Sequence, residues 1–222
     1  MTFRANLLNF VCTFEYENWD IIDFHKSLKF LKFENECVKL QNFKLYQGNK
    51  LSNQIDLIEN LNCKYSVMLA FSGDIRFSVL FRSNKQFRVS TSIPYEMMDN
   101  DIETYIYMIC DMIGELFHID VDNSNYYILM LNGVYYIEHN IMNTVINYER
   151  IKNMELFPCI LPPDYSGLIR RRKGTIKLYM HQNKKCGTIS INSKSFQLMG
   201  FTKLKEIMES IEKINLICER FK

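Results

Sequence analysis

The segment 184–200, KKCGTISINSKSFQLMG, decides the fold, because the same pattern occurs upstream in 75–91, IRFSVLFRSNKQFRVST. Both segments alternate apolar and polar residues on either side of a polar turn that contains serine and lysine, a pattern that predicts a β-hairpin. An apolar helical pattern follows each hairpin, over 102–117 in the upstream copy and from Thr202 in the downstream copy. A strand–strand–helix unit that occurs twice indicates an internal duplication.

The segments before the two hairpins also resemble each other. Each half opens with a strand pattern and continues with apolar residues at helical spacing. The first half has a strand over 6–16, a helix over 18–33 and a further strand over 63–71, whereas 38–60 looks irregular. The second half has a strand over 126–139, a helix over 142–154, a proline-rich loop over 157–167 and closing strands from Gly174. We therefore expect two repeats, 1–119 and 126–222, joined by a polar linker, 120–125.

The composition fits an ordinary globular protein with no dominant charge. The 222 residues are 47% hydrophobic and 23% charged, and the formal net charge is only +2. This charge predicts no protein-wide basic field, although it leaves room for local basic patches. The seven cysteines are odd in number and include no CxxC pair, which argues against a disulfide framework and against a zinc site. We expect an intracellular protein in a reducing compartment, with no segment that spans a membrane.

No sequence motif points to an enzyme. His118, Asp120 and Asp122 imitate a metal site, but the calcium-loop pattern lacks its glycine at the sixth position and its glutamate at the twelfth. The other histidines have no cysteine or serine nearby in a nucleophile-like setting, and the chain has no glycine-rich phosphate loop. We therefore expect neither a reaction nor a cofactor, metal or small-molecule substrate.

The residues resemble the TATA-binding protein family. The end of the chain is similar to the end of that family's second repeat, with Phe196–Gly200 in the place of its short final strand and 203–214 in the place of its carboxy-terminal helix. Asn9 in LNFV and Asn132 in LNGV take the places of the asparagines with which the two repeats begin. The runs Tyr148-Glu149 and Glu155-Leu156-Phe157-Pro158 resemble runs that precede the second repeat's sheet. The richness in Asn, Ile, Lys, Tyr and Phe further suggests a divergent member from a large cytoplasmic DNA virus.

The resemblance implies an α+β saddle in which two pseudo-symmetric repeats share one curved antiparallel sheet. Helices would cover the convex face, and the concave face would bind the minor groove of AT-rich DNA through asparagines and inserted apolar wedges. Phe81 matches a wedge position before a serine-containing turn, and its partner wedge falls near Tyr65. In the second half Ile191 matches, and the remaining wedge is either Phe157 by local motif or a residue near Ile176 by strand count.

Two further groups of residues follow from the resemblance. Val89 and Met199 stand where the family has minor-groove threonines, so that TATA selectivity is in question. A rim of cations on or beside the predicted strands would contact phosphates: Arg82, Lys85, Arg88, Lys177, Lys184, Lys185 and Lys194. The basic run Arg170–Lys173 is either a phosphate contact or a solvated loop. Each aromatic candidate is equally compatible with packing in the core, because half-buried strands alternate in the same way.

Two functions remain open from the sequence. In the first, the protein is a general transcription initiation factor that binds and bends AT-rich promoter DNA and recruits a factor IIB-like protein or RNA polymerase subunits. In the second, the fold is an interaction scaffold in a transcription complex and its affinity for DNA is weak or lost. A viral protein would work in the host cytoplasm, in viral factories, or in the virion, and any other would work in the nucleus. A small-molecule cavity between sheet and helix has only the abundance of aromatic residues in its favour.

Overall fold

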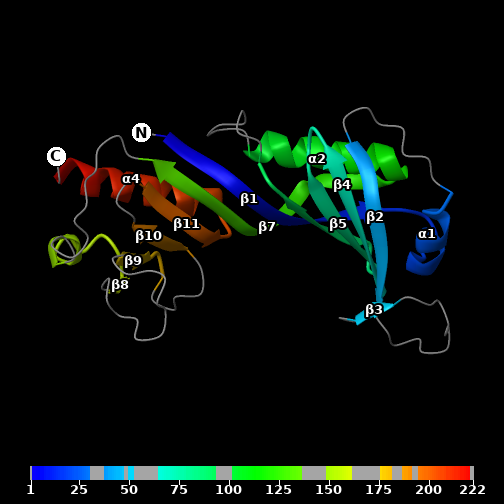
Figure 1. The fold of residues 1–222 in the computed structure, drawn as a ribbon, viewed down its shortest axis with the longest axis horizontal. Coiled ribbons are helices and arrows are strands. Elements are labelled where there is room, and N and C mark those ends of the chain that lie inside the picture. The colour runs from blue at the N-terminus through cyan, green and yellow to red at the C-terminus, as the bar shows by residue number, and fades with distance from the viewer. Residues whose placement is uncertain are drawn as a thin grey trace. The chain divides into compact units, whose positions relative to one another are not determined.

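Alternation of buried and exposed side chains defines the strands of this protein (Figure 1). The computed structural model describes residues 2–30, 38–47, 50–52, 65–93, 102–136, 149–161, 176–181, 187–191 and 195–220. In that part of the chain the strands are β1 (Thr2–Glu15), β2 (Val38–Gln47), β3 (Lys50–Ser52), β4 (Tyr65–Gly73), β5 (Phe77–Arg82), β6 (Gln86–Thr91), β7 (Asp120–Tyr136), β8 (Cys159–Leu161), β9 (Ile176–Tyr179), β10 (Thr188–Ile191) and β11 (Ser195–Phe201). The helices with assigned bounds are α1 (Ile21–Ser27), α2 (Ile102–Phe117) and α4 (Leu204–Arg220).

The strands form one hydrogen-bonded sheet. Its order within the described residues is β3-β2-β4-β5-β6-β1-β7-β11-β10-β9-β8, eleven strands in all. The pairings inside each half are antiparallel, as in β4 with β5 and β10 with β11. The fold class is therefore α+β, as the sequence predicts.

Contacts divide the chain into two compact units, which are described separately below. Unit 2 comprises 9–94 and 100–127, and unit 1 comprises 1–8, 95–99 and 128–222. The segment 120–125 is not a linker, because it forms the beginning of the long strand β7. The boundary between the units consequently falls within strands β1 and β7, where polarity along the sequence gives no signal of it.

An aromatic cluster forms the core of unit 2. Phe81 of β5 is fully buried, and its ring lies 5.1 Å from the ring of Phe117 on α2 and 4.9 Å from that of Phe24 on α1. Figure 1 shows α2 lying along β4 and β5. Helix α2 matches its predicted range because apolar residues recur at helical spacing along it, and Tyr105, Ile109 and the other buried positions pack against the sheet. Helix α1 is shorter than predicted and begins after Asp20, whose carboxylate accepts the N–H groups of residues 22 and 23.

Helix α4 covers the sheet of unit 1. The helix contacts β11 (Figure 1), and its buried residues include Ile207, Ile214 and Ile217. The Tyr135 hydroxyl of β7 donates a hydrogen bond to Asn215 Oδ1 of α4 over 2.6 Å. The side of β7 that carries Tyr135 therefore faces the helix. The predicted helix 142–154 is described only from residue 149, where 149–152 are helical. The predicted loop 157–167 contains β8, and the irregular region 38–60 contains β2 and β3.

Candidate nucleic-acid interface

One side of the unit 2 sheet faces away from α2. Residues that lie directly opposite each other in antiparallel strands point to the same side of the sheet. Lys44 pairs with Met68, Met68 with Leu80, and Leu80 with Arg88, so that these four side chains form one row across β2, β4, β5 and β6. The residues between them in sequence, such as Val67, Val79 and Phe81, are buried on the helix side. We call the side that carries the row the open face of unit 2. Its residues are Lys39, Asn42, Lys44, Tyr46, Ser66, Met68, Ala70, Ser72, Ser78, Leu80, Arg82, Gln86, Arg88 and Ser90.

The open face of unit 2 is positively charged. Among the residues just named, four are cations and none is acidic. Lys39, Lys44 and Arg82 are exposed, and Arg88 is partly exposed. The formal charge of the whole protein is only +2, so the residues outside this face sum to a charge of 2 − 4 = −2. A local concentration of four cations attracts a polyanion even when the protein as a whole is nearly neutral.

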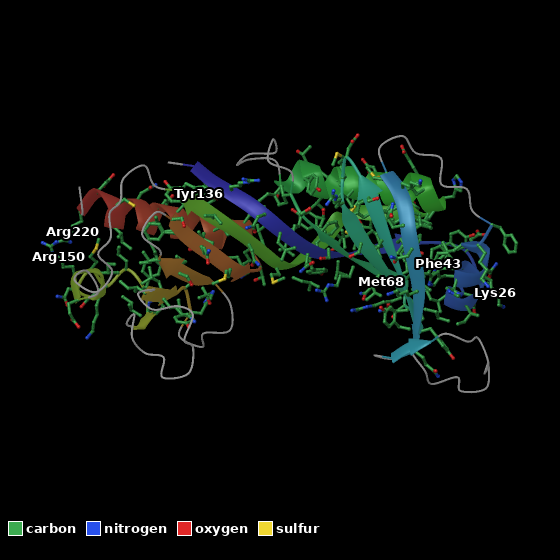
Figure 2. The ribbon with its side chains drawn as sticks, in the orientation of Figure 1. Lys26, Phe43, Met68, Tyr136, Arg150 and Arg220 are labelled. Carbon is green, nitrogen blue, oxygen red and sulfur yellow. The ribbon has the colours of Figure 1, made fainter. Side chains whose placement is uncertain are left out.

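The centre of the row is apolar. Met68 and Leu80 are register partners on adjacent strands, and both are partly exposed (Figure 2). Cβ atoms of directly opposite residues lie about 5 Å apart, so that the two side chains form one apolar ridge between Lys44 and Arg88. Methionine and leucine are among the side chains that minor-groove binding proteins insert between base steps. The row thus combines cationic groups at its ends with an apolar ridge at its centre.

The two predicted asparagines have different environments. Asn9 is only 3% exposed, and its side-chain oxygen is buried without a hydrogen-bond partner in the described structure. Alternation along β1 places Asn9 on the side opposite Phe10, and therefore opposite the aromatic core. In unit 1, Asn132 Oδ1 accepts the backbone N–H of Gly200 over 2.8 Å, at the point where the β7–β11 register shifts. The acceptor of Asn132 is thus used within the protein, whereas that of Asn9 is not.

Five residues predicted to contact DNA lie on the helix side of the sheet instead. Phe81, Val89 and Ile191 are each 0% exposed, and Phe157 is 6% exposed with Lys213 Nζ of α4 lying 5.3 Å from its ring centre. Ile176, the alternative to Phe157, is also 0% exposed, and Tyr65 lies on the same side as Val67. The reason is strand register, because a shift of one residue moves a side chain to the opposite face. The expectation that these side chains face DNA is therefore wrong for Phe81, whose neighbour Leu80 lies on the opposite, partly exposed side.

Some of the predicted cations do lie on the face opposite the helices. Arg82 and Arg88 belong to the open face of unit 2, whereas Lys85 sits in the β5–β6 turn with its Nζ 3.2 Å from Glu15 Oε2. Lys177 and Met199 occupy the corresponding side of unit 1. Three further predictions, Lys184, Lys185 and Lys194, lie outside the described residues, as does the run 170–173. Sequence reasoning missed four residues, Lys39, Lys44, Met68 and Leu80. Alternation in 65–82 was the signal that could have found Met68 and Leu80, whereas the two lysines share this side because of the bulge between Leu40 and Asn42 in β2.

Unit 1 has a row that corresponds to the one in unit 2. Lys177 pairs with Ser190, and Ser190 pairs with Gln197, across β9, β10 and β11. Lys177 and Gln197 are partly exposed, whereas Ser190 is 1% exposed with its hydroxyl oxygen unpaired among the described residues. The next register partner, across β7, is Val134, which is apolar and partly exposed, and Tyr136 two residues further along β7 is 48% exposed on the same side.

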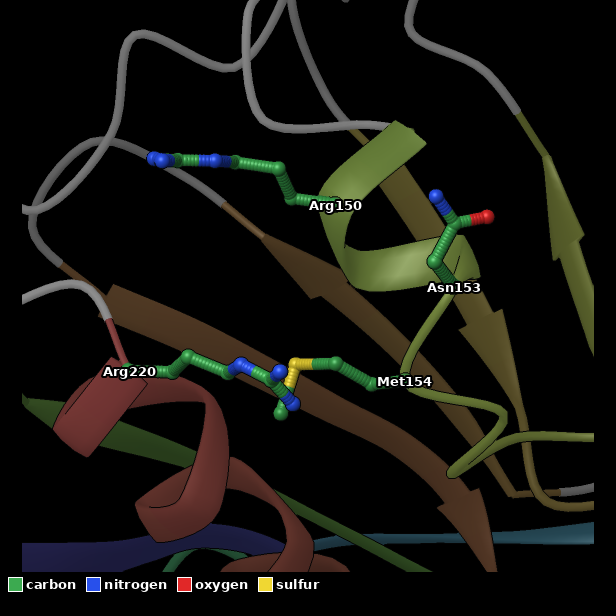
Figure 3. A pocket seen from close by; sticks show the side chains of 4 residues that line it. All are labelled: Arg150, Asn153, Met154 and Arg220. Atoms are coloured by element: carbon green, nitrogen blue, oxygen red, sulfur yellow. The ribbon is translucent and has the colours of Figure 1, made fainter.

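Unit 1 also has a surface pocket away from its sheet face. Arg150, Asn153, Met154 and Arg220 line a hollow of about 310 Å³, in which Arg220 reaches from the end of α4 toward Met154 (Figure 3). An adjoining hollow shares Met154 and Arg220 and adds Leu156, Leu216 and Glu219. The described residues contain no group of three or more side chains suited to hold a metal ion, and no helix among them is long and apolar enough to cross a membrane.

Comparison with known proteins identifies the fold. No family model matches the chain, and no curated protein sequence matches it either. Among solved structures, the TATA-binding protein of Methanococcus jannaschii is similar over 96% of this chain and 96% of its own, with a TM-score of 0.53 and 10% sequence identity. The protein thus has the fold of a TATA-binding protein.

Proposed function

We propose that this protein is a transcription initiation factor that binds double-stranded DNA through the open face of unit 2. The observation that carries the proposal is the row Lys44–Met68–Leu80–Arg88, which places an apolar ridge between cations. The fold adds support, since the similar solved structure is a TATA-binding protein. A TATA-binding protein kinks its DNA by about 80°, an established value for that class of protein.

The side chains of the row would divide the work. Lys39, Lys44, Arg82 and Arg88 contact phosphate oxygens, which sets the position of the duplex without reading its sequence. The ridge enters the minor groove and opens a base step, and AT-rich DNA that contains TA steps is preferred because those steps deform at lower cost. A complex of this kind would recruit a factor IIB-like protein or a polymerase subunit. It would act in the host cytoplasm or the virion if the protein is viral, and in the nucleus otherwise.

Duplex binding by charge-reversal variants tests the proposal. Fluorescence anisotropy at low salt would compare the wild-type protein with Lys44→Glu on the open face and Lys26→Glu on α1. Lys26 is a matched control, because it is an exposed lysine on the helix side with an ion pair of its own to Asp23 (Figure 2). We expect a large loss of affinity for Lys44→Glu and little change for Lys26→Glu. Equal losses, or no binding of AT-rich and GC-rich duplexes by the wild-type protein, would refute the proposal.

A second candidate function is an interaction scaffold, and the surface of α4 favours it. Met208 and Leu216 on that helix are 52% and 48% exposed, and Leu216 borders the hollow next to the one in Figure 3. Leu216 shares that hollow with Met154 and Leu156, and a contiguous apolar surface is typical of sites that bind other proteins. A protein that binds no duplex on its own, but binds one after a transcription partner is added, would support this function.

A further inference from the structure

One cation of the open face, Arg82, lies at the end of its strand. The other three cations of this face each have paired residues on both sides along the strand. Arg82 is the last residue of β5 and pairs with Ser66 of β4, but the pairing of β5 with β6 stops one residue earlier, at Phe81 with Phe87. Strand ends open more readily than strand interiors. The position of Arg82 therefore depends on contacts from outside the sheet.

Trp19 supplies a contact of this kind. Its indole Nε1–H donates a hydrogen bond to the backbone carbonyl oxygen of Arg82 over 3.0 Å, although the two residues are 63 positions apart in the chain. The indole is itself fixed by the aromatic cluster, since its ring lies 4.7 Å from the ring of Phe14 and 4.9 Å from that of Phe24. A packed tryptophan usually directs its N–H to a polar partner. The hydrogen bond thus ties the end of β5 to the core of unit 2.

The turn after Arg82 is held at its other end by separate contacts. The backbone N–H of Phe14 donates a hydrogen bond to the carbonyl oxygen of Lys85 over 3.1 Å, and Lys85 Nζ lies 3.2 Å from Glu15 Oε2. That ion pair is exposed, so it contributes little to stability. Both contacts act on Lys85. Among the described residues, the hydrogen bond from Trp19 is the only one in which a side chain reaches Arg82.

The Arg82 side chain needs this backbone contact in order to stay on the open face. Arg82 is exposed, and no carboxylate in the described part of the chain forms an ion pair with it, so its charge is available to a phosphate oxygen. A shift of one residue at a strand moves a side chain to the opposite face. Opening of the end of β5 would therefore turn the guanidinium away from a bound duplex without changing its charge.

We infer that Trp19 is a positioning residue for DNA binding, which keeps Arg82 on the open face from the helix side of the sheet. This inference rests on the proposed function and deepens it, because it names the residue that controls one of the phosphate contacts. The ring and the N–H of Trp19 have separate roles, since the ring packs in the cluster and the N–H holds Arg82.

Removal of the N–H alone tests the inference. Trp19 is the only tryptophan of the chain, so growth on 3-benzothienylalanine, in which sulfur replaces the N–H, changes this side chain and no other. The assay is anisotropy of an AT-rich duplex between about 50 and 200 mM salt. Loss of one phosphate contact lowers the slope of log K against log salt by about 0.9, so wild-type affinity should fall about 3.5-fold more than that of the substituted protein. Arg82→Gln should give the same slope, and combining both changes should lower it no further.

Phe87→Leu is the matched control, because it removes a fully buried ring that packs on Phe14 and Phe81 and keeps the indole N–H. It should lower stability in urea melts without changing the salt slope. Trp19→Phe lacks the same donor as the substituted protein and should give the same slope as that protein, so the test does not depend on one variant.

Three results would each overturn the inference while the wild-type protein binds the duplex. They are a wild-type slope in both proteins that lack the indole N–H, a further decrease of the slope when Arg82→Gln is added to either, and an equal decrease for Phe87→Leu. If the wild-type protein binds no duplex, the proposed function fails and the inference fails with it.

Discussion

Neutralising a single lysine of the open face should change how DNA binding depends on salt. Each phosphate contact made by a cation releases counterions, so that log K falls with log salt concentration by about 0.9 per contact. Lys44→Gln removes one such contact if Lys44 touches a phosphate. Over a fourfold rise in salt, wild-type affinity should therefore fall about 3.5-fold more than the affinity of the variant.

Removing all four cations of the open face gives a larger and more discriminating effect. Replacement of Lys39, Lys44, Arg82 and Arg88 by glutamine should lower the slope by about 3.6, which corresponds to about 150-fold over the same range of salt. The assay is anisotropy of one duplex between 50 and 200 mM salt, values that bracket the range in which such contacts are usually measured. Lys26→Gln on α1 should leave the slope unchanged. An equal decrease of the slope for Lys26→Gln, or an unchanged slope for Lys44→Gln, would refute the assignment of this face.

Three further predictions concern the stability of the fold. Phe81→Ala should lower the free energy of unfolding by about 3–5 kcal/mol in urea melts, because the ring is fully buried among aromatic neighbours; loss of DNA affinity without loss of stability would contradict this placement. The hydrogen bond to Cys12 and burial raise the pKa of Cys110 above its ordinary value of 9.0, so the folded protein favours the neutral thiol. The stability that Cys110 contributes is therefore fully present below pH 9.0 and is lost as the pH rises above that value. In urea melts above pH 9.0, the free energy of unfolding should decline less with pH for Cys110→Ala than for the wild-type protein. An equal decline in the two proteins would argue against the buried pair. Gly187→Ala and Gly200→Ala should each cost about 1–2 kcal/mol for positive φ. Gly187→Ala should cost more, because its Cβ would lie 2.9 Å from a methionine side chain, whereas Gly200 has open space; equal thermal shifts would contradict this difference.

The sequence predicts the elements of the fold better than it predicts the faces of the sheet. Helix α2 was predicted residue for residue, because its apolar spacing is regular and its acidic flank is clear. In β5, however, Phe77, Val79 and Phe81 alternate with Ser78, Leu80 and Arg82, and this alternation alone places the larger apolar set in the core. The family resemblance instead aligned Phe81 with a wedge, which would need an exposed side chain, whereas Phe81 is fully buried. Alternation was the better guide to the face.

Other features could not be read from local sequence at all. The bulge between Leu40 and Asn42 in β2 changes which residues face which side, and its position depends on pairing with β4. The register shift in β11 depends likewise on Asn132, which lies 68 residues from Gly200. Both features arise from contacts between distant segments, so periodicity within either segment carries no record of them. Because of the bulge, Lys39 and Lys44 lie on the same side of the sheet, and Lys44 is directly opposite Met68.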